Sequence, residues 1–137
     1  VAQALAAPQR LPAPAIEISC PQEVLVEQRA VVVPAPWASS LEKLPHRLVR
    51  VTLFEGPPEE QVSLVPDSDV QSKDGSVATW RLQQNGSRGY FLSCGYAHTT
   101  VRLVQRLAPS FSECVVSYRR EAAAGPGFRA VKRITCR

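Results

Sequence analysis

The 137-residue sequence contains no methionine and no long apolar segment. No stretch approaches the roughly 18 to 20 consecutive apolar residues of a membrane-spanning helix, which excludes such a helix. Because an initiator is missing and Ala4-Leu5-Ala6 resembles a signal-peptidase site, we expect an exported protein whose signal peptide has been removed. The Ala- and Pro-rich residues 1–15 are expected to form a disordered tether, and residues 16–137 a single domain.

The motifs of common catalytic and nucleotide-binding sites are also missing. Ser93 stands in S-C-G rather than in a G-x-S-x-G elbow, and Gly125-Pro126-Gly127 indicates a turn rather than a phosphate-binding loop. The carboxylates of residues 51–72 lie on a proline-rich loop, whereas glycoside hydrolysis needs a fixed pair in a cleft. The arginines are spread singly, without an aromatic-rich motif. We therefore expect that the protein is not an enzyme, needs no cofactor and binds no nucleic acid.

The four cysteines, Cys20, Cys94, Cys114 and Cys136, predict two disulfides and an oxidising compartment. None is a close neighbour of another, so the C-x(2–4)-C spacing of structural zinc sites is absent. If the strands around Cys94 and Cys114 belong to one sheet, both side chains project from the same face. This register favours Cys94–Cys114 with Cys20–Cys136, and pairing of Cys94 with Cys20 stays open.

A cysteine four residues before a histidine, Cys94 and His98, raises the question of a metal or catalytic pair. Cys94 lies on the inward side of an apolar alternation, whereas His98 falls in a predicted turn. The only other histidine, His46, has no carboxylate cluster near it in sequence. We interpret the pair as a disulfide cysteine followed by a turn and expect no metal site. Copper or zinc carriage by His46, His98 or a reduced cysteine is the alternative.

Apolar and polar residues alternate from residue 16 to the end, and no helical period competes with this pattern. Predicted strands cover residues 16–20, 23–33, 48–54, 77–82, 90–96, 100–107, 113–120 and 128–137. Short links join the last four strands and predict a C-terminal four-strand antiparallel meander. The expected fold is therefore all-β, a small antiparallel sandwich or partly closed barrel.

Charge is divided unevenly along the chain. Residues 1–69 hold five basic and nine acidic side chains, whereas residues 70–137 hold eleven basic and three acidic ones. The long link 55–76 is acidic at its start, where Pro58 can open a short helix. Because long loops in small domains are usually functional or disordered, we expect a partner protein to bind there. The predicted contacts are Glu55, Gly56, Pro57, Pro58, Glu59 and Glu60, with the turn residues Tyr96, His98 and Thr99 as a second contact.

Three aromatic residues are candidate exposed anchors of such an interface: Trp37, Tyr96 and Phe111. Trp37 follows the Pro34-Ala35-Pro36 stop, Tyr96 ends a predicted strand, and Phe111 lies in a link.

Several segments resemble a family of small exported proteobacterial proteins of largely unassigned function. They are I-x-C-P at 18–21, Trp37, HRLVRVTLFEGPPEE at 46–60, LVPD at 64–67, TWRL at 79–82, YFLSCGYAHTTVRLVQRL at 90–107, and the later C-x-V-x-Y and I-x-C. The resemblance implies a periplasmic immunity protein, linked to type VI secretion, that occludes the active site of a peptidoglycan-targeting toxin. A cell-envelope protein that binds anionic polymers through the basic half is a further alternative. The oligomeric state and the identity of the toxin are left open.

Overall fold

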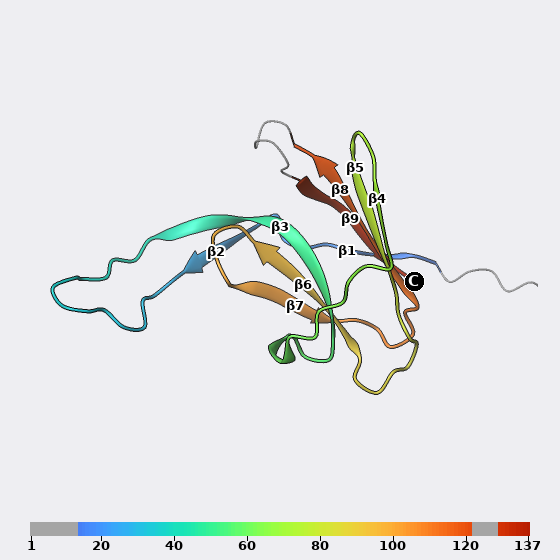
Figure 1. Cartoon of the computed structure of the whole chain (residues 1–137), viewed down its shortest axis with the longest axis horizontal. Coiled ribbons are helices and arrows are strands. Elements are labelled where there is room, and N and C mark those ends of the chain that lie inside the picture. The colour runs from blue at the N-terminus through green and yellow to red at the C-terminus, as the bar shows by residue number, and fades with distance from the viewer. Residues whose placement is uncertain (1–13, 122–128) are drawn as a thin grey trace, which may run out of the picture.

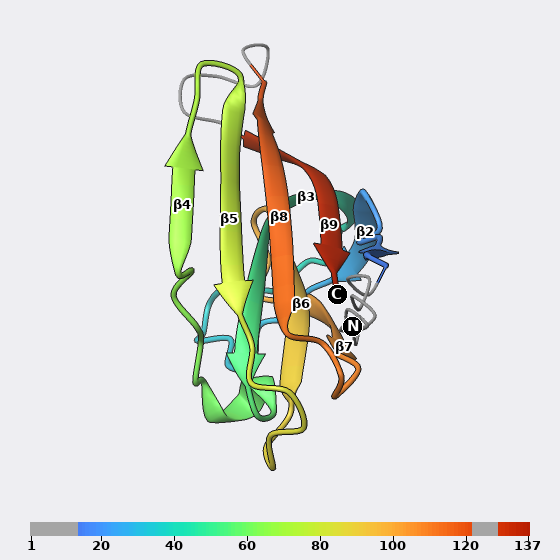
Figure 2. The same ribbon diagram turned by 90° about the vertical axis from the view of Figure 1, so that its right-hand side faces the viewer.

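A computed structural model describes residues 14–121 and 129–137, which form two antiparallel sheets (Figures 1 and 2). The five-stranded sheet has the order β1 (Ile16–Ile18), β9 (Arg129–Cys136), β8 (Glu113–Arg120), β5 (Gly75–Arg81), β4 (Ser68–Gln71). The four-stranded sheet has the order β2 (Glu23–Glu27), β3 (Lys43–Glu55), β6 (Tyr90–Tyr96), β7 (Arg102–Arg106). One short 3-10 helix, η1 (Pro58–Glu60), interrupts the strands. The all-β class and the antiparallel pairing are confirmed.

The core lies between the two sheets and is built from the inward side of the alternation. Leu53 and Leu92 come from the four-stranded sheet, and Trp80, Val116 and Ile134 from the five-stranded sheet; all are buried. Burying a side chain of this size stabilises the folded state by roughly 1.5–3 kcal/mol. The two-residue period of the sequence is therefore what assigns one face of each strand to the core.

Each predicted strand corresponds to an observed one, but several bounds differ and one strand was missed. The largest extension is in β3, which begins at Lys43, five residues before the predicted start at 48. The run 23–33 ends as a strand at Glu27, and residues 28–42 leave the sheet as a long connection. Strand β4 falls within the long link 55–76, for which the sequence predicts no strand. All four of its residues are exposed, and it pairs only with β5 at the sheet edge. An edge strand without a buried face has no apolar alternation to reveal it.

The predicted four-strand meander is wrong at its centre. β6 pairs with β7 and β8 pairs with β9, as expected, but β7 and β8 belong to different sheets. The link between them contains Leu107 and Phe111, both buried in the core. Phe111 is therefore not the exposed anchor that the sequence suggested. Packing of these two side chains between the sheets turns a short link into a sheet-to-sheet crossing.

Both cysteine pairs form disulfides, but the favoured pairing is wrong. The bonds are Cys20–Cys94, with Cα atoms 5.9 Å apart, and Cys114–Cys136, with Cα atoms 4.1 Å apart. Cys114 and Cys136 lie directly opposite each other on β8 and β9. Cys94 lies in the other sheet, so the register that placed it beside Cys114 does not exist. The option left open, Cys20 with Cys94, is the one the fold adopts.

The predicted tether, residues 1–15, lies outside the described residues except for Pro14 and Ala15, which are exposed. Among the residues that the structure describes, no helix is long and apolar enough to cross a membrane.

Candidate partner-binding surface

The acidic segment Glu55–Glu60 begins at the end of β3 and passes into η1, as the sequence predicts. Gly56 has a φ of 75°, a conformation that glycine adopts without steric cost, and its N–H donates to the carbonyl of Gly89 (2.9 Å). Pro58 is buried and Glu55 half-buried. Only Pro57, Glu59 and Glu60 are open to a partner, whereas Gly56 and Pro58 hold the backbone in place.

Basic side chains from distant strands compensate part of this acidic charge. Arg88 forms an ion pair with Glu60, and Arg102 on β7 donates a hydrogen bond to the carbonyl of Pro58 (3.1 Å). The sequence around this segment, residues 51–72, contains acidic but no basic side chains. Its basic partners, Arg88 and Arg102, lie about 30 and 40 residues further along the chain. The acidic segment is therefore less negative, and more firmly held, than its sequence suggests.

The predicted turn contact lies in the β6–β7 connection. The Ala97 N–H donates to the carbonyl of Arg47 (2.8 Å), and the Nδ1 of buried His46 donates to the carbonyl of Ala97 (2.7 Å). His98 is exposed and has a φ of 60°, and Thr99 is half-exposed beside it. His98 and Thr99 thus lie at an accessible tip, and hydrogen bonds between β3 and Ala97 hold this turn in place.

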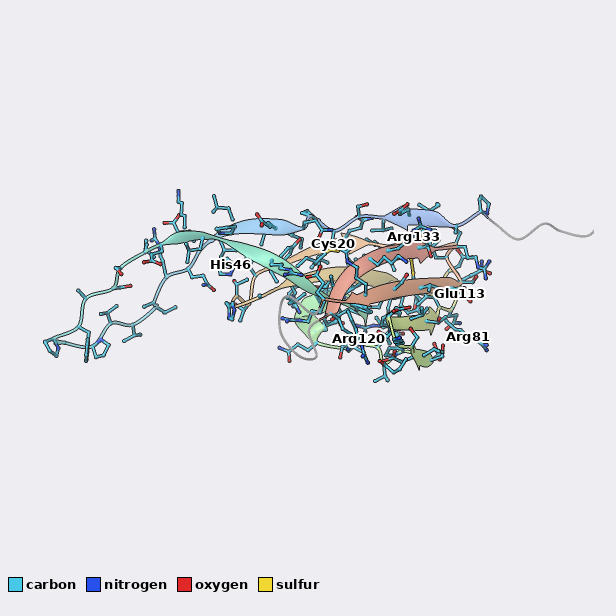
Figure 3. The ribbon with its side chains drawn as sticks, turned by 90° about the horizontal axis from the view of Figure 1, so that it is seen from above. Cys20, His46, Arg81, Glu113, Arg120 and Arg133 are labelled. Carbon is cyan, nitrogen blue, oxygen red and sulfur yellow. A yellow bond between two sulfur atoms is a disulfide. The ribbon has the colours of Figure 1, made fainter. Side chains whose placement is uncertain are left out.

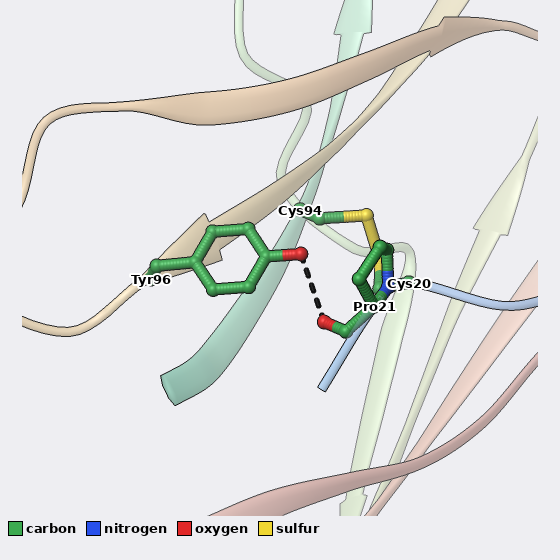
Figure 4. The surroundings of a disulfide bond; sticks show 4 residues. All are labelled: Cys20, Pro21, Cys94 and Tyr96. Atoms are coloured by element: carbon green, nitrogen blue, oxygen red, sulfur yellow. Dashed lines mark hydrogen bonds between the residues drawn. A yellow bond between two sulfur atoms is a disulfide. The ribbon is translucent and has the colours of Figure 1, made fainter. Parts of the chain in front are cut away.

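Tyr96 does not belong to this accessible tip, contrary to the prediction. Its side chain is 0% exposed, and its hydroxyl donates a hydrogen bond to the carbonyl of Pro21 (2.8 Å; Figure 4). Burial raises the pKa of the Tyr96 hydroxyl. Tyr96 therefore secures the chain next to the Cys20–Cys94 bond instead of contacting a partner.

The two predicted contact regions are not neighbours. Register places Glu55 opposite Tyr90 at the start of β6, and Leu48 opposite Tyr96 at its end. Six residue steps of about 3.3 Å separate these positions, or about 20 Å along the strand. The acidic segment and the turn therefore lie at opposite ends of β6.

The most projecting feature of the described chain was not predicted from sequence. Residues 28–42, which we call the arm, join β2 to β3 and extend away from both sheets, beyond His46 (Figures 1 and 3). Most of its side chains are apolar and open to solvent: Val31 is 99% exposed, Val32 79% and Trp37 75%. Trp37 is thus exposed, as an anchor has to be. Exposed apolar side chains gathered on one projection are typical of binding sites.

A signal for the arm is present in the sequence but is easily misread. Polar Gln28-Arg29 breaks the apolar run 23–33, and Pro34-Ala35-Pro36 stops it six residues later. The Trp37 N–H donates to the carbonyl of Pro34 (2.9 Å), which closes a turn in the middle of the arm. Two interruptions this close argue against one continuous strand.

The arm and the turn meet at their bases. The Gln28 side-chain amide donates to the carbonyl of His98 (3.4 Å), which joins the first residue of the arm to the tip of the β6–β7 connection. The structure therefore brings His98 and Thr99 together with the arm, and leaves Glu55–Glu60 at the far end of the sheet.

The spacing of Cys94 and His98 marks a disulfide followed by a turn, because Cys94 is bonded to Cys20. His46 uses its Nδ1 atom to hold the turn. Within residues 14–121 and 129–137, no three His, Cys, Asp or Glu side chains are grouped so that they could hold a metal ion.

Comparison with known proteins adds one finding. A family model described as "Type VI secretion system Tli immunity protein" matches residues 42–137, which is more than half of the chain. The matched segment begins at the last residue of the arm and contains β3 to β9. Searches of the curated proteins and of the solved structures returned no match. The chain belongs to the type VI secretion system Tli immunity protein family.

Proposed function

We propose that this chain is a periplasmic immunity protein that binds a type VI secretion toxin and occludes its active site. Membership of an immunity family implies a toxin protein as partner and favours an inhibitor over an enzyme. The two disulfides and the family fit an exported protein. The observation that carries the proposed mode of binding is the exposed, apolar arm with Trp37 and Val31.

An occluding element has to project, and it has to gain free energy when it is buried. Side chains that are almost fully exposed in the unbound protein, such as Val31 and Trp37, lose the most water-accessible apolar area on binding. Tryptophan is among the residues most enriched at binding hot spots. The arm is anchored on β2 and β3, and a disulfide ties the adjoining segment to β6. The two strands therefore hold the base of the arm in place before the toxin binds.

Two further contacts belong to the proposal. His98 and Thr99, beside the base of the arm, would meet the rim of the toxin cleft. The exposed Pro57, Glu59 and Glu60 would form a separate contact at the other end of β6. Their partners would be cationic groups, because Glu59 and Glu60 carry negative charge.

The proposed target is a toxin that acts on peptidoglycan. This part rests on the resemblance of the sequence to immunity proteins against cell-wall toxins. A toxin in the periplasm also has access to membrane phospholipid, so inhibition has to be measured on both substrates. Inhibition of peptidoglycan release from isolated cell wall would support the proposed class. Inhibition only of phospholipid hydrolysis would replace it while leaving the immunity role in place.

The experiment that tests the proposal starts with the oxidised domain as bait for toxins secreted by the source organism. A captured toxin is then purified, and its affinity is measured for the unaltered chain and for two matched variants. Val31→Ser with Val32→Ser alters the arm, whereas Val65→Ser with Val70→Ser removes two other highly exposed valines, 86% and 63% exposed, outside the arm. We expect the arm variant to bind at least about tenfold more weakly, or 1.4 kcal/mol, and the control to bind normally. Equal affinity of both variants would remove the arm from the interface.

A further inference from the structure

The outer face of the four-stranded sheet carries arginines and phenylalanines in register. Because paired residues share a face, Arg50 on β3, Gly95 on β6 and Arg102 on β7 form one row. Phe54, Phe91 and Arg106 form a second row, four residues later on β3 and β7 and four residues earlier on the antiparallel β6. Leu53, Leu92 and Cys94 point to the opposite side and are buried. We call the outward surface of Arg50, Phe54, Phe91, Arg102 and Arg106 the arginine face.

Aromatic rings hold two of these guanidinium groups in place. The Cζ atom of Arg102 lies 5.1 Å from the centre of the Phe54 ring, and that of Arg106 lies 5.9 Å from the centre of the Phe91 ring. Phe54 is buried even though it belongs to the outer face. A cation over a ring is stabilised at roughly 0.5–1 kcal/mol in exposed sites. The two arginines therefore lose little side-chain freedom when a partner binds.

Gly95 leaves room for the third arginine. A Cβ atom at Gly95 would lie 2.7 Å from Cγ and 2.8 Å from Nε of Arg50, so the Arg50 side chain lies directly across the backbone of β6. Any side chain at this position would push Arg50 away from the sheet. The glycine is thus a structural condition for the arrangement of the arginine face.

Arg50, Arg102 and Arg106 form no ion pair within the described chain, although Arg102 also donates a hydrogen bond to the backbone carbonyl of Pro58. No carboxylate among residues 14–121 and 129–137 lies within 4.0 Å of the guanidinium groups of Arg50, Arg102 or Arg106. The remaining residues, 1–13 and 122–128, contain no Asp or Glu. All three arginines are exposed. Arg88, by contrast, is paired with Glu60 at the edge of this surface.

Like charges gathered on neighbouring strands repel each other, and an anionic ligand would relieve that repulsion. A guanidinium group offers planar pairs of N–H donors that match a carboxylate. Val104 lies between Arg102 and Arg106 on β7 and is 42% exposed, so the charges alternate with apolar surface. Arginine mixed with aromatic and aliphatic side chains is the composition of protein interfaces.

We infer that the arginine face is a docking surface for an acidic protein surface, with Arg50, Arg102 and Arg106 each binding Asp or Glu carboxylates. The acidic surface would belong to the toxin, and this identification rests on the proposed function. The face lies between the turn at one end of β6 and the acidic segment at the other. It can therefore add charge recognition to the apolar contact of the arm.

The first test does not need the toxin. A decaglutamate peptide is titrated into the protein while the arginine Nε–Hε signals are followed by NMR. We expect saturable shifts for Arg50, Arg102 and Arg106. Affinity should fall at least about tenfold when all three are changed to Gln, as expected when several charge-assisted contacts are lost.

The matched control changes Arg81, Arg120 and Lys132 to Gln, which removes the same net charge from the other sheet. Arg81 and Arg120 lie on β5 and β8, away from the arm (Figure 3). The control should retain peptide binding within about threefold, since distant exposed charges are largely screened. Equal loss in both triple variants would overturn the inference, because net charge alone would then explain binding.

A second test uses the captured toxin and compares the arginine triple with the arm variant. Loss of toxin binding in the arginine triple, with a shallower dependence on salt, supports the inference. If no toxin is captured, the proposed function fails, and the peptide titration still decides whether the face binds carboxylates.

Binding of phosphatidylglycerol vesicles without binding of decaglutamate would overturn the inference in favour of a membrane surface. If the Gln triple does not fold, a Lys triple keeps the charge but lacks the planar donor pairs, and is expected to bind the peptide at least about threefold more weakly.

Discussion

The hydroxyl of Tyr96 donates a 2.8 Å hydrogen bond to the backbone carbonyl of Pro21, the residue that follows the disulfide-bonded Cys20 (Figure 4). Tyr96 lies on β6 two residues after Cys94, so the bond and the disulfide hold the same pair of segments. Cys20 and Pro21 carry the chain from β1 in one sheet to β2 in the other. A buried tyrosine and a disulfide together secure this crossing at the start of β2, whose other end leads into the arm.

Replacing Tyr96 with Phe should destabilise the domain by about 1 kcal/mol, because the carbonyl of Pro21 loses its donor while the ring stays buried. Urea unfolding measures this as a lower midpoint at unchanged slope. Tyr90→Phe is the control, since its hydroxyl accepts a bond from the exposed Gln83 N–H. A midpoint for Tyr96→Phe equal to that of the control would show that water replaces the lost bond.

The two disulfides should differ in their contribution to stability. Cys20–Cys94 spans 74 residues and Cys114–Cys136 spans 22. In the chain-entropy account, these loops correspond to about 4.5 and about 3.4 kcal/mol respectively. Changing Cys20 and Cys94 to Ala should therefore lower the free energy of unfolding more than changing Cys114 and Cys136. The reverse order would mean that packing of β8 against β9 depends on its disulfide more than loop entropy accounts for.

A side chain at Gly75 should destabilise the domain. A Cβ atom there would lie 1.9 Å from the backbone oxygen of Tyr118 on the neighbouring strand, so β5 and β8 would have to separate. We expect Gly75→Ala to destabilise the domain by about 1–3 kcal/mol, the usual range for overpacking. Gly86→Ala is the control, because a Cβ atom there would lie an ordinary 3.6 Å from the carbonyl oxygen of Gln83. Thermal unfolding distinguishes the two variants, and equal midpoints would contradict the clash.

Stability should decline at acidic pH partly through Glu121. A hydrogen bond from Arg47, with Arg119 in support, lowers the pKa of Glu121 below its ordinary value of 4.5. A group whose pKa is lower in the folded state stabilises the fold above its unfolded pKa, and this contribution is lost as pH falls through the folded pKa. Stability should therefore fall below about pH 4.5 in the unaltered protein, and less steeply in Glu121→Gln.

The matched control for this measurement is Glu42→Gln, which changes an exposed carboxylate on the arm. Its unfolding midpoint should follow that of the unaltered protein from pH 6 to pH 3, a range chosen to bracket the ordinary carboxylate pKa of about 4. If Glu121→Gln keeps the same acid dependence as the control, the contact between Arg47 and Glu121 does not link the two sheets energetically.

The strands themselves were readable from the sequence. Segments 90–96 and 113–120 were predicted with their observed bounds, and the helical turn at Pro58 was expected from its proline and acidic residues. These features depend on local rules, namely the two-residue period of a half-buried strand and the preference of proline for a first helical turn. Family resemblance was likewise carried by short segments of sequence.

What the tertiary structure decided is where each segment stands relative to distant ones. The chain changes sheets after β7, where Leu107 and Phe111 pack between the sheets, and this change separates Cys94 from Cys114; Cys94 is bonded to Cys20 instead. The same non-local packing buries Tyr96 and leaves Trp37 exposed, although both are aromatic residues next to predicted strand ends. The sequence alone determined where most strands with a buried face lie, because alternation acts over a few residues; it missed the fully exposed β4 and extended β2 past Glu27. Only the fold determined which side chains a partner can reach, because burial depends on segments far apart in the chain.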